Sequence, residues 1–105
     1  MNKILIICAA GASSTLIAEK TEKELRSRGF DAHVESCGYF EGKDRIREGD
    51  CTLYLNSPQT RMYFKSFSED AAALGRPIIQ IPQSMYLPLE AETKALADLI
   101  EQELQ

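Results

Sequence analysis

The run Ile4 to Ile7 constrains the fold most, because four branched aliphatic residues follow one another and lead directly into Cys8. A strand with one face in water alternates apolar and polar residues, whereas a strand that is apolar at every position must be covered on both faces. Such strands lie at the centre of parallel sheets, between layers of helices. We therefore expect residues 4–7 to form a central parallel strand.

The next part of the chain alternates between helical and extended patterns. A helix is expected from Ser13 to Arg28, and Gly29 follows it where a left-handed residue would end it. Residues 30–35 then alternate apolar and polar side chains, which predicts a strand near an edge of the sheet with one wetter face. Residues 38–50 mix glycines with charged residues, so we expect a short helix or a loop there.

The second half repeats this alternation. A third strand is expected over residues 51–55, a helix with Tyr63, Phe67, Ala71 and Leu74 on one face, a fourth strand over residues 78–81, and a final helix with Leu89, Thr93, Leu96, Ile100 and Leu104 on one face. Four alternations predict an α/β fold with one domain over residues 1–105: a four-stranded parallel sheet, doubly wound, with helices on both faces.

Charge and composition exclude several classes of function. The chain has 105 residues with 12 Lys and Arg against 16 Asp and Glu, a formal net charge of −4, so nucleic acid is not an expected partner. No segment has the roughly 20 apolar residues of a membrane span, and the first residues lack a convincing cleavage region, so we expect a cytoplasmic protein without direct membrane insertion. Three cysteines at these spacings indicate reduced thiols, with no metal or cofactor.

Cys8 lies at the carboxyl end of the first strand, the edge where ligands bind in such sheets. The residues after it are small or carry hydroxyls and can form an amide-lined loop, with Ser13, Ser14 or Thr15 capping the helix: Ala9, Ala10, Gly11, Ala12, Ser13, Ser14 and Thr15. Free amides at a helix N-terminus predict an anion-binding site, and the same field favours the thiolate of Cys8. The alternative is that Cys8 is simply a small buried residue.

The remaining notable side chains have structural explanations. Cys37 and Cys51 are expected to be buried structural thiols, and His33 a solvated surface group. Core packing explains the helical spacing of Met62, Tyr63, Phe64 and Phe67. A solvated helix face explains Glu19, Lys20, Glu22, Lys23, Glu24 and Arg26.

An apolar strand ending in "CAAGASST", then "DCTLYLNSPQ", then "IIQIPQSMY" before a final helix resembles the cytoplasmic IIB component of the lactose/cellobiose (chitobiose) class of the bacterial phosphoenolpyruvate-dependent sugar phosphotransferase system. The resemblance extends over nearly the whole chain. The sequence departs from the pattern at Ser57, where a glycine commonly precedes the Pro-Gln pair, and at Pro88, where a glycine-containing turn is expected.

The resemblance implies that Cys8 takes a phosphoryl group from a phosphohistidine on the IIA component and passes it to a sugar, a β-linked disaccharide, bound by the membrane IIC component. The amides of residues 9–15 would hold the phosphoryl oxygens, with no general base needed on this chain. Both partners would meet a rim of Ser57, Pro58, Gln59, Gln83, Ser84, Met85 and Tyr86, unless Met85 and Tyr86 only cover the end of the core.

Three other functions stay open. Low-molecular-weight tyrosine phosphatases and arsenate reductases share the expected fold and a cysteine loop after the first strand, but they place an arginine where this chain has Ser14. The loop from Pro82 to Pro88 also lacks an Asp or Glu to protonate a leaving group. A redox pair of Cys8 with Cys37, or a regulatory module that binds a partner or an anion without catalysis, are the remaining alternatives.

Overall fold

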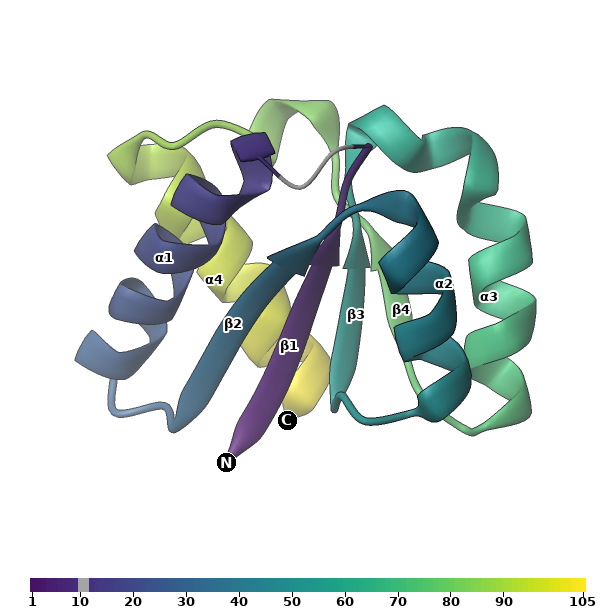
Figure 1. The fold of residues 1–105 in the computed structure, drawn as a ribbon. Helices are drawn as coiled ribbons and strands as arrows, with labels where there is room; N and C mark the ends of the chain where they lie inside the picture. Colours follow the sequence, from purple (N-terminus) through teal and green to yellow (C-terminus); the bar gives the residue numbers. More distant parts are fainter. Residues whose placement is uncertain (10–11) are drawn as a thin grey trace.

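Four parallel strands form a sheet in the order β2-β1-β3-β4 (Figure 1). The structure, a computed structural model, describes residues 1–9 and 12–105. The strands are β1 (Asn2–Ile7), β2 (Ala32–Cys37), β3 (Leu53–Asn56) and β4 (Ile78–Gln80). The predicted parallel sheet is confirmed, with β1 between two neighbours and β2 at an edge, as their patterns of apolar residues indicate.

Helices cover both faces of the sheet (Figure 1). On one face lie α1 (Ala12–Ser27) and α4 (Glu90–Leu104), and on the other lie α2 (Tyr39–Glu48) and α3 (Phe64–Ala73). Two short 3₁₀ helices, η1 (Pro58–Tyr63) and η2 (Gln83–Met85), follow β3 and β4. Both lie at the carboxyl edge of the sheet, where the strands end.

The apolar run of β1 supplies both cores. Ile4 and Ile6 pack against α1 and α4, whereas Leu5 and Ile7 pack against α2 and α3, and all four side chains are fully buried. Burying one aliphatic side chain contributes about 1.5–3 kcal/mol, so this single strand anchors both layers.

Glycines decide how residues 38–50 fold. This segment forms α2, and Gly49, at a left-handed φ of 67°, ends the helix. Gly29, after α1, has a φ of 81° and likewise ends its helix, which confirms its predicted role.

Gly42 is buried where α2 crosses β1, and a Cβ placed there would lie 2.7 Å from Cγ2 of Ile7. The helix can therefore approach the sheet this closely only because Gly42 has no side chain.

The prediction that Met62 and Tyr63 belong to the core is wrong. Met62 is 72% exposed and Tyr63 is 37% exposed, whereas Phe67 is buried as expected. The 3₁₀ turns of η1 precede α3, so the helical period that predicts burial does not extend back to these residues. Leu74, just past the end of α3, is likewise exposed.

We expect Gly42→Ala to lower the free energy of unfolding by about 1–2 kcal/mol. Overpacking against Ile7 costs about 1–3 kcal/mol, and the better helix propensity of alanine recovers up to about 1 kcal/mol. Urea denaturation of Gly42→Ala, Ile7→Ala and the double variant measures the coupling. If alanine at position 42 costs the same in the Ile7→Ala background, Ile7 is not what Gly42 accommodates.

Candidate functional site

The backbone around Cys8 is fixed by both neighbouring strands. The N–H of Cys8 donates to the carbonyl of Cys37 at 3.0 Å, and the N–H of Ser57 donates to the carbonyl of Ile7 at 2.9 Å. The side chain of Cys8 has no exposed surface. Burial alone fits a structural cysteine, so a chemical role depends on what the sulfur contacts.

The sulfur of Cys8 contacts a hydroxyl on the first helix. Sγ of Cys8 lies 3.1 Å from Oγ of Ser14, and both residues are fully buried. When the cysteine is a thiol, either atom can donate. When it is a thiolate, only the hydroxyl can donate, and this hydrogen bond to a charged sulfur is stronger than one to a neutral thiol. The sequence predicts Ser14 as a phosphate-binding residue, but it carries no signal that the hydroxyl would meet the sulfur.

The capping role predicted for Ser13, Ser14 or Thr15 is wrong, because α1 already begins at Ala12 and all three residues lie inside the helix. All three residues belong to the start of α1, which faces the carboxyl edge of the sheet (Figure 1), and N–H groups at the start of a helix can bind an anion. Thr15 Oγ1 lies 3.3 Å from Oγ of Ser36, which ties this turn to β2.

Of the four other residues predicted to line the loop, the structure describes two. Ala9 is exposed next to Cys8, and Ala12 lies in the first turn of α1. Ala10 and Gly11, also predicted to bind phosphate, lie outside the described residues. The described part of the site therefore has a buried thiol, a buried hydroxyl and a helix N-terminus at one edge of the sheet.

A buried polar network stands behind Cys8 on the β3 side. The hydroxyl of Thr60 lies 2.7 Å from Oδ1 of Asn56 and 3.2 Å from the carbonyl of Ile7, and it donates its one proton to one of them at a time. Asn56 Nδ2 donates to the carbonyl of Thr60 at 3.0 Å and to Oε1 of Gln80 at 2.8 Å. These bonds hold the start of η1 against the end of β1.

Gln80 completes this network from β4. Its Nε2 lies within hydrogen-bonding distance of the carbonyls of Asn56, at 3.2 Å, and Ser57, at 3.1 Å. Asn56, Ser57 and Thr60 have at most 1% of their surface exposed. Alternation of apolar residues does not predict a polar cluster of this kind, although "NSPQT" after a strand does predict a turn.

Only part of the predicted rim is at the surface. Gln59, Gln83 and Ser84 are exposed, and Pro58 is partly exposed. The prediction is wrong for Ser57, which is fully buried, and for Tyr86, which is 8% exposed within the core between the sheet and α4. Met85 is partly buried against the same core, which favours the alternative that Met85 and Tyr86 cover its end.

Cys37 and Cys51 are buried, reduced thiols, as predicted. Burial, reinforced by the Glu41 carboxylate, raises the pKa of Cys37 to about 12. Burial and the charge of Asp50 raise the pKa of Cys51 to about 11. Both therefore stay protonated at neutral pH and are poor nucleophiles.

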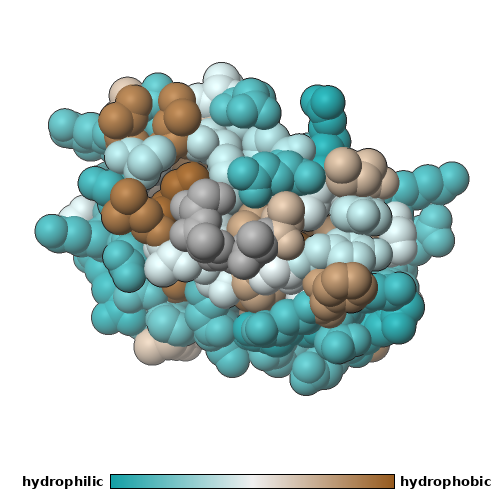
Figure 2. Space-filling model, turned by 45° about the horizontal axis from the view of Figure 1, so that its top comes forward, coloured by the Kyte–Doolittle hydropathy of each residue, from teal (hydrophilic) through white to brown (hydrophobic). Residues whose placement is uncertain are grey.

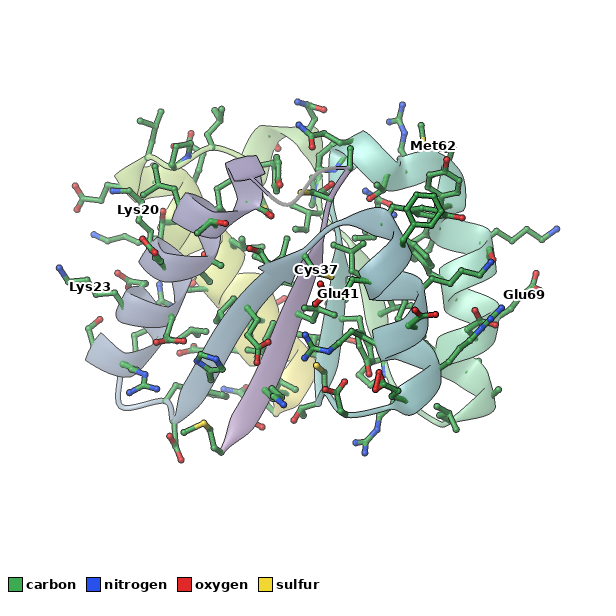
Figure 3. The ribbon with its side chains drawn as sticks, in the orientation of Figure 1. Lys20, Lys23, Cys37, Glu41, Met62 and Glu69 are labelled. Carbon is green, nitrogen blue, oxygen red and sulfur yellow. The ribbon has the colours of Figure 1, made fainter. Side chains whose placement is uncertain are left out.

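The redox pairing of Cys8 with Cys37 is not favoured by the geometry. Cys37 packs with Leu5 and Ile7 on the α2 and α3 face, where Figure 3 labels it near Glu41. Cys8 instead directs its sulfur toward Ser14 on α1, which covers the opposite face. Adjacent strands bring the two backbones together, but the two side chains point to different faces.

His33 lies at the other end of the sheet, paired in register with Lys3, so it is not placed to act on Cys8. Its side chain is 43% exposed, and Nδ1 lies 2.8 Å from Oε1 of Glu22. On α1, Glu19, Lys20, Lys23 and Arg26 are exposed as predicted, whereas Glu22 and Glu24 are partly buried and hydrogen-bonded.

Within residues 1–9 and 12–105, no group of three or more His, Cys, Asp or Glu side chains is arranged to hold a metal ion. Over the same ranges, no helix combines the length and the apolar character that crossing a bilayer requires.

Known structures share this fold. The lactose-specific IIB component domain of the phosphotransferase system from Streptococcus pneumoniae superposes with a TM-score of 0.78 at 22% identity, covering 98% of this chain and 94% of that one. The cellobiose-specific phosphotransferase IIB component from Borrelia burgdorferi gives a TM-score of 0.69 at 23% identity, covering 93% and 86%.

Sequence comparison reaches the same group of proteins. The lactose-specific EIICB component of Staphylococcus haemolyticus is 24% identical over 97% of this chain, but the match covers only 17% of that longer protein. The chain thus spans less than a fifth of the curated relatives it matches. Residues 3–99 match the family described as PTS system, Lactose/Cellobiose specific IIB subunit. With nearly its whole length matched, the chain belongs to the lactose/cellobiose-specific IIB family of the phosphotransferase system.

Proposed function

We propose that Cys8 is a phosphoryl carrier, which accepts a phosphoryl group from a phosphohistidine on a IIA protein and passes it to a sugar bound by a membrane IIC component. The observation that carries this proposal is the contact of the Cys8 sulfur with Ser14 at the N-terminus of α1. A buried structural cysteine needs no hydroxyl partner, whereas a thiolate nucleophile is stabilised by one. We further propose a β-linked disaccharide as the sugar.

In the first step, the thiolate of Cys8 attacks the phosphorus in line with the bond to the histidine nitrogen. The S–P bond forms, the N–P bond breaks, and its electron pair returns to the imidazole. Charge on the equatorial oxygens would be met by backbone N–H groups of residues 9–15, including those of the first turn of α1. Because the sulfur has no exposed surface, the donor must displace part of what covers it.

In the second step, a sugar hydroxyl attacks the same phosphorus. The O–P bond forms, the S–P bond breaks, and the thiolate leaves with the electron pair. A basic group on the sugar-binding component takes the proton of the hydroxyl. Here the Ser14 hydroxyl stabilises the departing thiolate, so one contact serves both directions of transfer.

The residue six positions after Cys8 differs from that of a low-molecular-weight phosphatase. Ser14 occupies the position where such an enzyme would place an arginine on the phosphate, and its hydroxyl meets the sulfur instead. A site that stabilises the thiolate but carries no arginine in its loop favours passing the group on over hydrolysing it.

Replacing the nucleophile is the first test. We expect Cys8→Ser to accept phosphate at less than about one hundredth of the wild-type rate, because a serine hydroxyl is the poorer nucleophile without a general base. The measurement is intact-mass spectrometry with phosphopeptide mapping after incubation with phosphorylated IIA. Cys51→Ala is the matched control and should be phosphorylated normally.

Two outcomes would contradict the proposal. Wild-type transfer rates in Cys8→Ser would mean that another residue carries the phosphoryl group. Stable binding of phosphorylated IIA without any transfer would identify a non-catalytic binding module.

The Ser14 contact makes a separate prediction. We expect Ser14→Ala to slow transfer about 10- to 100-fold, because a hydrogen bond to a charged group contributes about 1.5–3 kcal/mol. Single-turnover rates from phosphorylated IIA measure this effect.

Thr21→Ala is the matched control for Ser14→Ala. Thr21 is a buried hydroxyl residue on the same helix whose Oγ1 donates to the carbonyl of Ile17 at 2.7 Å, away from the sulfur. Equal rates for the two variants, at similar melting temperatures, would remove Ser14 from the site.

A further inference from the structure

An exposed group of large side chains lies on the α2 and α3 side of the carboxyl edge. We call it the aromatic patch: Tyr39 and Phe40 begin α2, and Met62 and Tyr63 end η1. Phe40 is 81% exposed and Met62 is 72% exposed. Figure 2 shows apolar side chains on both sides of this edge, with separate tan and brown groups on the α2 and α3 side, where Figure 3 labels Met62. Clustered apolar side chains in water mark interaction surfaces.

The aromatic rings of the patch pack against each other and against a buried ring below them. The rings of Tyr39 and Tyr63 have centroids 4.0 Å apart, and the ring of buried Phe67 lies 5.7 Å from that of Tyr39. With Ala9, Gln59 and Thr60, the patch surrounds a hollow of about 350 Å³. Because Ala9 directly follows Cys8 in the chain, this hollow lies next to the backbone that carries the proposed nucleophile.

The segments at this edge carry almost no charge. Residues 8–16, 37–40, 57–64 and 81–89 contain only one Asp, Glu, Lys or Arg, which is Arg61, although the chain has 12 basic and 16 acidic residues. Arg61 is exposed and lies in η1 next to Met62. Just beyond these segments, Glu41 is paired with Arg45 at 3.7 Å and Glu90 with Lys94 at 3.0 Å.

We propose that the aromatic patch and Arg61 form the docking surface for the protein that donates the phosphoryl group, an inference that rests on the proposed function. A phosphohistidine carries its negative charge before transfer, so carboxylates at this edge would repel it and a guanidinium attracts it. The sugar that later accepts the group is neutral and gives Arg61 no charge to recognise. The charge pattern therefore fits the donor rather than the acceptor.

Apolar contact and charge have separable effects on the encounter. Phe40 and Met62 bury apolar area on the donor, which contributes to affinity. Arg61 attracts the phosphorylated donor at a distance, which raises the association rate at low ionic strength. In a chain of net charge −4, an edge whose segments carry one arginine and no Asp or Glu repels an anionic group less than an average part of the surface does.

The test is the rate of phosphoryl transfer to Cys8 from a purified, histidine-phosphorylated IIA protein of the lactose/cellobiose class, measured by rapid quench. We expect Arg61→Gln to lower kcat/KM about tenfold at low salt and to make the rate less dependent on salt. Phe40→Ala and Met62→Ala should each raise KM several-fold, leaving the salt dependence intact. Melting temperatures should change little, because these side chains are exposed.

Two controls match these changes. Lys23→Gln removes the same charge from α1, on the other side of the sheet (Figure 3), and Leu74→Ala removes an exposed apolar side chain beyond the end of α3. Both should transfer at the wild-type rate. An Arg61→Lys variant should recover the salt dependence.

The outcomes separate this inference from the proposed function. If wild-type protein is phosphorylated and Arg61→Gln behaves like Lys23→Gln, the docking surface is wrong while the carrier role stands. If the patch variants slow only the later transfer to sugar, the surface serves the acceptor and the inference is overturned. If wild-type protein accepts no phosphoryl group, the proposed function fails and this inference fails with it.

Discussion

Two hydrogen bonds on either side of one peptide unit hold the site in place. The N–H of Cys8 bonds to the carbonyl of Cys37, and the carbonyl of Ile7 accepts the N–H of Ser57. These bonds lie at the carboxyl ends of the ladders that join β1 to β2 and β3, where a parallel sheet brings its strand ends together. These bonds place the sulfur near the start of α1, where it lies 3.1 Å from Oγ of Ser14.

The polar network of Asn56, Thr60 and Gln80 explains why the chain turns sharply at this point. An apolar cluster could fill the same space, but it would not specify a direction for the backbone. A buried amide left without partners costs about 1–3 kcal/mol, so the network is stable in one arrangement of η1 against β1. The position of the aromatic patch relative to Cys8 follows from that arrangement.

The pattern of apolar residues predicts the layers of this fold well and the details of its edge poorly. Four unbroken aliphatics identify β1, because only burial on both faces satisfies them. Helical spacing alone predicts that Tyr63 belongs to the core. This prediction is wrong because the 3₁₀ turns of η1 change the helical phase just before α3. The expected cap on α1 failed for a similar reason, since "ASST" fits both a cap and a first turn. The contact of Ser14 with Cys8 depends on where α1 crosses β1, which local sequence does not encode.

The distribution of charge at the carboxyl edge becomes interpretable only when the fold is known. Arg61 is one of many charged residues in the sequence, but the topology gathers four segments that otherwise lack Asp, Glu, Lys and Arg around it. Folding stability does not require this, because exposed loops tolerate charge at little cost. The carrier role proposed for Cys8 does require it, since every carboxylate near the sulfur would oppose both the approach of a phosphoryl group and the charge that this group leaves on the protein. The proposed docking surface would also account for the exposure of Phe40 and Met62, because apolar contact is the remaining source of affinity where charge is excluded.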